Sequence, residues 1–232
     1  MSTQDHGVIL LASGLSQRLG YPKQLLKKND APLIDYMLKL ALATEPQVVI
    51  VVIPKDSLLI ADAIKKWVIK EPKVRTVINP SPETGMGHSL YLGVESLNQF
   101  ARSSAPTSAL MKRVLIMGID QVLLDEAHLH QLLTGSATVV ASRYSSWQCL
   151  DNDTSNSDLE NPSKAVVGLP LVIDYPRLKR WQSRLNGDKG LRHLIRALPP
   201  AQLQTISNPQ LSYDIDTPEQ LNYAKAQGWV DS

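Results

Sequence analysis

The side chains best suited to chemistry stand within the first 26 residues, directly after an apolar run. The segment from 10 to 26 reads LLASGLSQRLGYPKQLL. Its small residues Ala12, Ser13 and Gly14 would let backbone N–H groups approach a phosphate closely. Arg18 and Lys23 then supply cationic groups suited to a triphosphate. Neither a G-x-G-x-x-G pattern nor a Walker loop is present, so a different kind of phosphate loop is predicted.

A second glycine-rich string begins at Asn79-Pro80 and continues from Gly85 to Ser89 as GMGHS. A glycine-rich turn that opens a helix presents free N–H groups to an anion or to the edge of a base. The hydroxyl of Ser89 suits either of two roles, a helix cap or a contact with a nucleobase.

Carboxylates follow at two further places. Asp120 comes just after the apolar run 114–117, and Asp214 and Asp216 belong to the string YDIDTPE. A carboxylate at the end of a buried strand is a hard-oxygen ligand for Mg²⁺, while the alternative for Asp120 is a helix cap. Pro218 predicts the first turn of a helix capped by Asp216 or Thr217. Capping explains one of the two carboxylates, Asp214 and Asp216, and leaves the other over.

The elements that must position these residues alternate between two periodicities. Short apolar runs predict buried strands at 7–12, 47–53, 74–78, 114–117, 137–141 and 203–206. Apolar residues at spacings of three and four predict helices at 31–43, 56–70, 88–100, 125–133, 175–184, 189–196 and 217–226. This alternation predicts an α/β fold, a single three-layer domain over residues 1–232 with a mostly parallel central sheet. Ligands of such sheets bind beyond the carboxyl ends of the strands.

The alternation of strand and helix patterns stops between 142 and 172, where we expect a small antiparallel excursion from the parallel sheet. Its middle, residues 151–163 (DNDTSNSDLENPS), is acidic and rich in turn residues. We interpret this segment as the surface tip of a hairpin, with a flexible lid as the alternative.

Composition excludes several classes of protein. Hydrophobic residues make up 43% and charged residues 20%, which excludes general disorder. A formal charge of +2 gives no argument for nucleic acid or an anionic membrane as partner. Cys149 is the only cysteine, and neither a signal peptide nor an apolar run of about 18 residues is evident. We therefore expect a cytoplasmic protein.

The first motif resembles the opening of the nucleotidyltransferases with a glycosyltransferase-A-like fold, L-A-(A/G)-G-x-S-x-R-M-G-x-x-K. More narrowly, it resembles the molybdenum cofactor cytidylyltransferases and their guanylyltransferase relatives. The matching residues are Leu11, Ala12, Gly14, Ser16, Arg18, Gly20 and Lys23. Leu19 replaces the usual methionine, and Ser13 replaces the alanine of the cytidylyl branch and the glycine of the guanylyl branch.

Five later strings resemble the same family in the same order. The second motif is N-P-x-x-x-x-G-M-x-x-S-L, and the third resembles C-D-Q-P with Ile119 and Val122 in place of cysteine and proline. Gly168-Leu169-Pro170 resembles G-H-P without its histidine. Residues 187–192 resemble G-D-K-G-A-R, with Arg192 in place, and residues 214–221 resemble D-I-D-T-P-E-D-L, with Gln220 for the second acid.

The resemblance implies transfer of CMP from CTP to a molybdopterin-type cofactor, with Mg²⁺ as cofactor and a molybdenum hydroxylase apoenzyme as the downstream partner. The implied catalytic residues are Arg18, Lys23 and Asp120. The implied nucleotide contacts are Leu11, Ala12, Ser13, Gly14, Asn79, Gly85 and Ser89. Asp120, Asp214 and Asp216 would hold the metal, with Asp214 slightly favoured and Asp216 assigned a shared cap and metal role. The acceptor contacts would be Gln121, Gly168, Pro170, Asp188 and Lys189. The alternatives are guanylyl or other NTP transfer, another acceptor such as a sugar phosphate, or a delivery protein without turnover.

Overall fold

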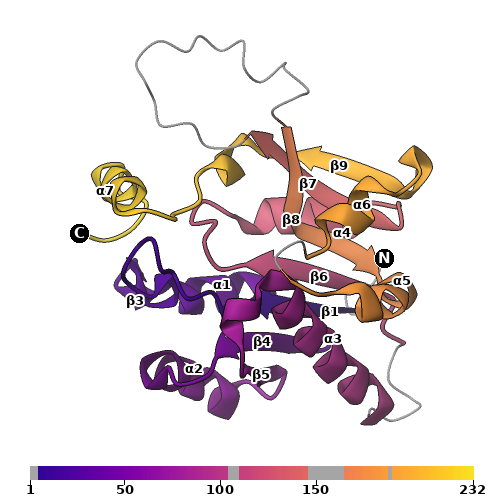
Figure 1. Cartoon of the computed structure of the whole chain (residues 1–232), viewed down its shortest axis with the longest axis horizontal. Coiled ribbons are helices and arrows are strands. Elements are labelled where there is room, and N and C mark those ends of the chain that lie inside the picture. The colour runs from indigo at the N-terminus through magenta and orange to yellow at the C-terminus, as the bar shows by residue number, and fades with distance from the viewer. Residues whose placement is uncertain (1–4, 104–109, 146–164, 188–189) are drawn as a thin grey trace.

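A computed structural model describes residues 5–103, 110–145, 165–187 and 190–232 of the chain. Its centre is a seven-stranded sheet in the order β5-β4-β1-β6-β8-β7-β9 (Figure 1). The strands are β1 (His6–Leu11), β4 (Val49–Pro54), β5 (Val74–Asn79), β6 (Arg113–Gly118), β7 (Val139–Ser145), β8 (Ala165–Asp174) and β9 (Leu203–Ser207). This confirms a single α/β domain with a mostly parallel sheet.

Antiparallel pairing occurs where the sequence predicted an excursion, but within the main sheet. Strand β8 runs antiparallel to both β6 and β7, whereas the other neighbours in this sheet are parallel. The predicted hairpin tip at 151–163 lies outside the described residues. A separate two-stranded sheet joins β2 (Lys27–Lys28) to β3 (Ala31–Pro32).

Helices cover both faces of the sheet, which produces the three predicted layers. They are α1 (Leu33–Ala43), α2 (Leu58–Lys70), α3 (Met86–Ser103), α4 (Glu126–Thr134), α5 (Tyr175–Trp181), α6 (Arg192–Arg196) and α7 (Pro218–Ala226). Side chains of α1, α2, α4 and α7 share one apolar core, and those of α3, α5 and α6 share the other. Along β1, Val8 and Leu10 enter the first core, whereas Ile9 and Leu11 enter the second. This alternation is the side-chain period of a strand buried on both faces.

Several predicted helix boundaries shift for local reasons. Helix α1 begins at Leu33 and not at Ala31, because Ala31–Pro32 pairs with Lys27–Lys28 in the small sheet. Helix α3 begins at Met86, two residues before the predicted start. The helix predicted at 175–184 is α helical only as far as Trp181 and then continues as a 3-10 turn.

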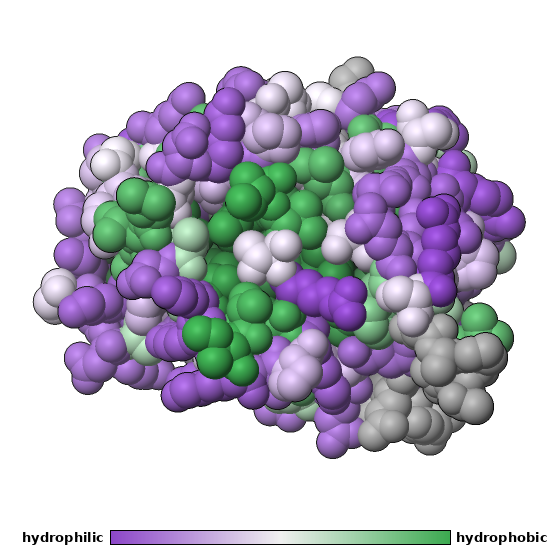
Figure 2. Space-filling view, turned by 90° about the horizontal axis from the view of Figure 1, so that it is seen from below, coloured by the Kyte–Doolittle hydropathy of each residue, from purple (hydrophilic) through white to green (hydrophobic). Residues whose placement is uncertain are grey.

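One surface of the molecule gathers apolar side chains in its middle (Figure 2). The view is from below Figure 1, where α2, α3 and the edge strand β5 lie. Exposed apolar side chains on these elements include Leu58, Leu59 and Ile69 of α2 and Ile78 of β5. In the described part of the chain, no helix combines the length and the apolarity that a membrane crossing requires.

Candidate active site

The parallel strands bring the first three motifs to one edge of the sheet. Strands β5, β4, β1 and β6 run in the same direction, so their carboxyl ends share that edge. Ser13 follows β1, Asn79 ends β5, and Asp120 follows β6. Asp214 reaches the same edge from the C-terminal part of the chain through an isolated antiparallel bridge with Gln121.

Two adjoining cavities open at this edge. The smaller has a volume of about 210 Å³, and the larger about 770 Å³. We call them the nucleotide lobe and the acceptor lobe, after the contacts that the sequence predicts for some of their lining residues. Leu11, Met86, Asp120 and Leu169 line both. The nucleotide lobe is also lined by Ser13, Gly14, Ser16, Lys23, Pro82, Gly85, Ser89, Gly118 and Ile119. Asp120 therefore lies at the junction between the two cavities.

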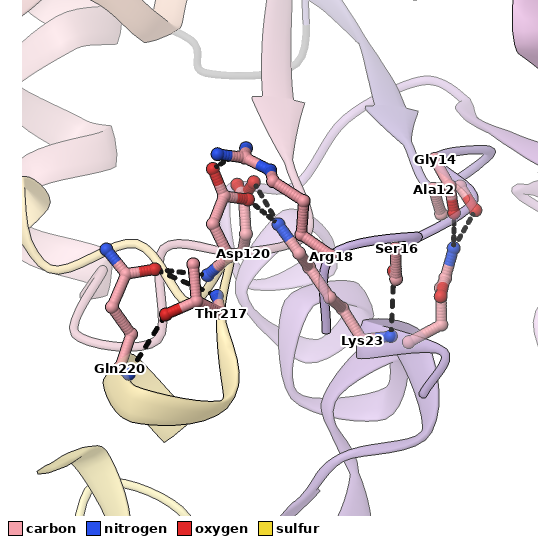
Figure 3. A network of polar contacts seen from close by, with 10 residues as sticks. Ala12, Gly14, Ser16, Arg18, Lys23, Asp120, Thr217 and Gln220 are labelled. Carbon is pink, nitrogen blue, oxygen red and sulfur yellow. Dashed lines mark hydrogen bonds and ion pairs between the residues drawn. The ribbon is translucent and has the colours of Figure 1, made fainter. Parts of the chain in front are cut away.

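Lys23 is the centre of the polar contacts at this junction (Figure 3). Its side chain is only 10% exposed, and its ammonium lies 3.3 Å from a carboxylate oxygen of Asp120. The same ammonium contacts the carboxylate of Asp216. Arg18, whose side chain is 71% exposed, donates to Asp216 at 2.5 Å. The two predicted cations and two of the three predicted carboxylates thus form one network, although 193 residues separate Lys23 from Asp216.

These contacts set the charge states of the network. Burial lowers the pKa of Lys23, but the carboxylates of Asp120 and Asp216 outweigh it and raise the pKa above its ordinary value. Burial raises the pKa of Asp216, but Lys23 and then Arg18 outweigh it and hold that pKa below its usual range. Burial raises the pKa of Asp214 to about 6, assisted by the charges of Asp120 and Asp216. Of the three carboxyl groups, Asp214 is therefore the one whose negative charge is least compensated by Lys23 and Arg18.

The helix cap corrects one expectation. Thr217 is the N-cap of α7, and its hydroxyl accepts from the backbone N–H of Gln220 at 3.3 Å. The side chain of Gln220 accepts in return from the N–H groups of Thr217 and Asp216. Because Thr217 and Gln220 complete a capping box, the predicted shared cap role of Asp216 is wrong, and its carboxylate is directed to Lys23 and Arg18.

The loop after β1 is held by a side chain that the sequence did not single out. Gln24 is fully buried, and its amide donates to the carbonyls of Ala12 (2.7 Å) and Gly14 (3.0 Å). The N–H of Ala12 bonds to Val52 O within the sheet, so Ala12 offers no free donor to a phosphate. Ala12 supports the loop from beneath, and the lobe is lined by Ser13 and Gly14 instead. An amide between the phosphate loop and the helix predicted at 31–43 carries no sequence signal for this role.

Ser13, Ser89 and Asn79 meet beneath the nucleotide lobe. The hydroxyls of Ser13 and Ser89 are 2.6 Å apart, and the amide of Asn79 donates to Ser89 Oγ at 3.0 Å. Asn79 is fully buried and does not line either lobe, so it acts on the site through Ser89.

The predicted acceptor residues are only partly brought to the acceptor lobe. Gln121 and Gly168 line it, whereas Pro170 does not and instead accepts at its carbonyl from Ser142 Oγ at 2.7 Å. The predicted positions 188 and 189 lie outside the described residues. Asp214, predicted as a metal ligand, also lines this lobe. The rest of the lining is largely apolar with a basic edge and was not predicted: Leu90, Ile116, Tyr144, Val167, Leu171, Leu191, Arg192, His193, Ile195 and Arg196. Arg192 matches the last position of the family string G-D-K-G-A-R, but the sequence predicted no role for it.

Tyr144 stands out among these because it faces the carboxylates. Burial raises its pKa to about 12, and the charges of Asp120 and Asp214 add to the effect. A Cβ added to Gly168 would lie 3.1 Å from its hydroxyl, so a larger residue there would crowd Tyr144. At neutral pH the phenol is therefore a neutral donor at the wall of the lobe.

The loop before α6 packs directly on the start of α3. The N–H of Gly87 donates to Gly187 O at 2.8 Å, and a Cβ at Gly87 would lie only 2.6 Å from Asn186 O. Glycine is therefore required at position 87 for this close approach. This contact brings Asn186 and Gly187 beside the glycine-rich turn of the nucleotide lobe.

The carboxylates suit a divalent cation without forming a complete cage. Within the described residues, no group of three or more His, Cys, Asp or Glu side chains is arranged to hold a metal by itself. Asp120 and Asp216 nonetheless converge on one cation, the Lys23 ammonium. Because Mg²⁺ takes hard-oxygen ligands and usually needs only one or two carboxylates beside substrate phosphates, these residues fit it.

Comparisons with solved structures show a fold shared with distant proteins. A homologue of the Mycobacterium tuberculosis protein Rv0371c, from Mycobacterium sp. strain JC1, has a TM-score of 0.68 at 21% identity, covering 98% of each chain. Rv0371c of M. tuberculosis H37Rv in complex with manganese has a TM-score of 0.61 at 18% identity, covering 95% of this chain and 97% of that one. The 4-diphosphocytidyl-2C-methyl-D-erythritol synthase of Anaerococcus prevotii has a TM-score of 0.63 at 16% identity, covering 97% and 96%.

The sequence itself matches a family over most of its length. No curated protein matches the chain. Residues 8–204 match the MobA-like NTP transferase domain, and this range includes the phosphate loop, the glycine-rich turn and Asp120. The chain, whose Asp120 lines two adjoining cavities and contacts Lys23, belongs to the family of MobA-like NTP transferase domains and is a nucleotidyltransferase.

Proposed function

We propose that this nucleotidyltransferase transfers CMP from CTP to the phosphate of a molybdopterin-type cofactor and releases pyrophosphate. The observation that carries the proposal is the position of Asp120, which lines both cavities and contacts the Lys23 ammonium. A nucleoside triphosphate in the nucleotide lobe and a phosphorylated acceptor in the other would meet at this carboxylate.

The chemistry needs no nucleophile from the protein. An oxygen of the acceptor phosphate attacks the α-phosphorus of CTP, a new P–O–P bond forms, and the bond to pyrophosphate breaks. Asp120 and Asp216 would hold Mg²⁺, which neutralises charge on the phosphates when bound. Lys23 and Arg18, which contact Asp216 in the free protein, would turn to the triphosphate and stabilise the departing pyrophosphate.

Support for a metal and for CTP comes from the distant relatives as well as from the site. Rv0371c is known in complex with manganese, and the Anaerococcus synthase is named for a diphosphocytidyl product. In this chain, Ser13 is close to alanine in size and narrows the nucleotide lobe as the alanine of the cytidylyl branch would. A narrower lobe favours a pyrimidine over a purine.

Support for the acceptor comes from the lining of the acceptor lobe and from the motifs. The lobe combines apolar walls with the guanidinium groups of Arg192 and Arg196, which suits a molecule with an apolar body and an anionic group. Gln121 and Gly168 lie in this lobe, and both belong to motifs that resemble the cytidylyltransferases. One cysteine in 232 residues suits a reducing compartment, and we propose the cytoplasm as the location.

A second candidate is the same transfer to another phosphorylated acceptor, such as a sugar phosphate. The observation that favours it is Leu169, which lines both lobes at the position where the resembling family has histidine. Leucine, unlike histidine, offers no polar contact at the place where the two ligands would meet. A delivery protein without turnover is the weaker candidate, because the network of Arg18, Lys23, Asp120 and Asp216 is complete.

Thermal shift with CTP, GTP, ATP and UTP, each with Mg²⁺, tests the nucleotide. Because a ligand that binds the native state raises its melting temperature, we expect the largest rise with CTP. A larger rise with GTP would refute the cytidylyl assignment and leave nucleotidyl transfer standing.

The metal assignment is tested with Asp120→Asn, an uncharged side chain of the same shape. We expect the fold to persist and turnover to fall on the order of 10²-fold or more, because the amide is a poor Mg²⁺ ligand. Wild-type turnover by this variant would remove Asp120 from the site.

A further inference from the structure

Lys28 is a half-buried lysine of β2 whose ammonium pairs with no carboxylate in the described part of the chain. It donates instead to the backbone carbonyl of Val122 at 2.5 Å, and it lies 4.4 Å from the centre of the Tyr36 ring. Burial lowers the pKa of Lys28, so placing a charged ammonium there costs free energy. A methionine would pack on Tyr36 without that cost, so packing alone does not explain the lysine.

The carbonyl that Lys28 binds belongs to the loop that carries Asp120. The N–H of Val122 donates to the carbonyl of Asp120 at 3.1 Å, so the backbone of Val122 joins the lysine to the aspartate. The phenol of Tyr36 donates likewise to the carbonyl of Leu124 at 2.8 Å. Two side chains from outside the loop therefore fix two of its carbonyls.

The Asp120 carboxylate depends on this loop for its position. Among the described residues its hydrogen-bond donor is Lys23 at 3.3 Å, whereas strong charge-assisted bonds measure about 2.7–2.9 Å. The side chains of Val122 and Leu124 are fully buried in the apolar core. We therefore expect the loop to stay folded without Lys28 and to lose only the fixed direction of its backbone.

Lys28 is itself held in place by a residue distant in the sequence. The turn that follows it contains Asn29 and Asp30, whose φ angles are 54° and 60°. The carboxylate of Asp231 accepts from the N–H of Asn29 at 3.0 Å and from the N–H of Asp30 at 2.8 Å. The strand that carries Lys28 is therefore anchored independently of the loop that it supports.

We propose that Lys28 is a positioning residue for the transfer reaction. Its ammonium holds the carbonyl of Val122 and, through the backbone of Val122, places the Asp120 carboxylate at the junction of the two lobes. Lys28 lines neither lobe, so it acts through the loop and not by contact with a ligand. The inference rests on the proposed metal role of Asp120.

Amide hydrogen exchange of the free protein measures the placement of the loop without nucleotide or metal. In Lys28→Met we expect the N–H of Val122 to exchange roughly fivefold faster than in the wild type, the effect of losing one hydrogen bond. The matched control is Lys27→Met, which removes the exposed neighbouring lysine and should leave this amide unchanged. An unchanged exchange rate in Lys28→Met would overturn the inference.

Kinetics with CTP, Mg²⁺ and molybdopterin show whether Lys28 acts through Asp120. We expect Lys28→Met to lower kcat roughly tenfold and to leave the KM for CTP near wild type, because a displaced carboxylate slows the reaction while the residues that bind CTP keep their places. In the Asp120→Asn background the same substitution should lower kcat no further.

Two kinetic results would overturn the inference while leaving the proposed function intact. The first is a wild-type kcat in Lys28→Met, and the second is an equally large loss in both backgrounds, because Lys28 would then act elsewhere. A wild type without turnover would instead refute the proposed function, and the exchange rates alone would then decide whether Lys28 holds the loop.

Discussion

At the scale of single residues, the free site is neutralised by its own cations. Lys23 occupies the space between Asp120 and Asp216, and Arg18 completes the charge of Asp216 from the solvent side. The two basic residues nevertheless differ sharply in environment, with side chains 10% and 71% exposed. The contribution of an ion pair depends on how far water is excluded from it. The cost of losing each cation should therefore differ.

Lys23→Met is expected to lower the free energy of unfolding by about 2 kcal/mol, because it leaves two half-buried carboxylates beside an apolar side chain. Arg18→Met should cost less than about 1 kcal/mol, as exposed pairs do. Urea denaturation at pH 7.5 without nucleotide measures both. Equal losses for the two variants would show that Lys23 does not hold the carboxylates together.

Asp214 gives the site a pH dependence of stability. An acid whose pKa is raised in the folded state, here to about 6, stabilises the fold below its unfolded pKa, near 4, and loses this contribution as the pH rises through 6. Asp214→Asn removes this titrating group. The free energy of unfolding of the variant minus that of the wild type should therefore rise by about 1–2 kcal/mol from pH 4 to pH 7.5, after allowance for partial exposure. Denaturation curves of the wild type and of Asp214→Asn, recorded from pH 4 to pH 7.5, measure this difference. A constant difference would contradict the raised pKa.

At the scale of elements, the start of α7 positions the second half of the site. The capping box of Thr217 and Gln220 fixes the backbone directly after Asp216. The string around Asp216, which the sequence predicts to bind a metal, thus also forms the start of a helix. The cap of that helix fixes the direction in which the Asp216 carboxylate points.

Thr217→Ala should cost about 1 kcal/mol of stability, because it removes a working N-cap, and it should also weaken CTP binding by releasing Asp216. Ser57→Ala is the control at the N-cap of α2, where the serine makes no side-chain hydrogen bond, and it should leave both quantities near wild type. Guanidinium denaturation and nucleotide titration of the two variants make the comparison. Similar behaviour of both would show that the cap does not position the site.

At the scale of the whole molecule, periodicity was enough to predict the layered fold. Five of the six apolar runs coincide with most of a strand of the main sheet, and the run at 137–141 covers the start of β7, because buried strands need continuous apolar stretches. The strands β2 and β3 were missed because two-residue strands carry no period. Residues placed in the site by tertiary contacts, such as Gln24 and Tyr144, were also missed. Their roles depend on what the fold brings beside them, and spacing along the chain does not encode that.

If the proposed function is right, a nucleotidyl group passes from the ligand of one lobe to the ligand of the other. The most direct measurement follows CTP labelled at the α-phosphate, incubated with the protein, Mg²⁺ and molybdopterin. We expect the label to move to the acceptor while unlabelled pyrophosphate is released, and Asp120→Asn to slow both events together. Label that stays in CTP, or an acceptor that gains the γ-phosphate instead, would contradict it.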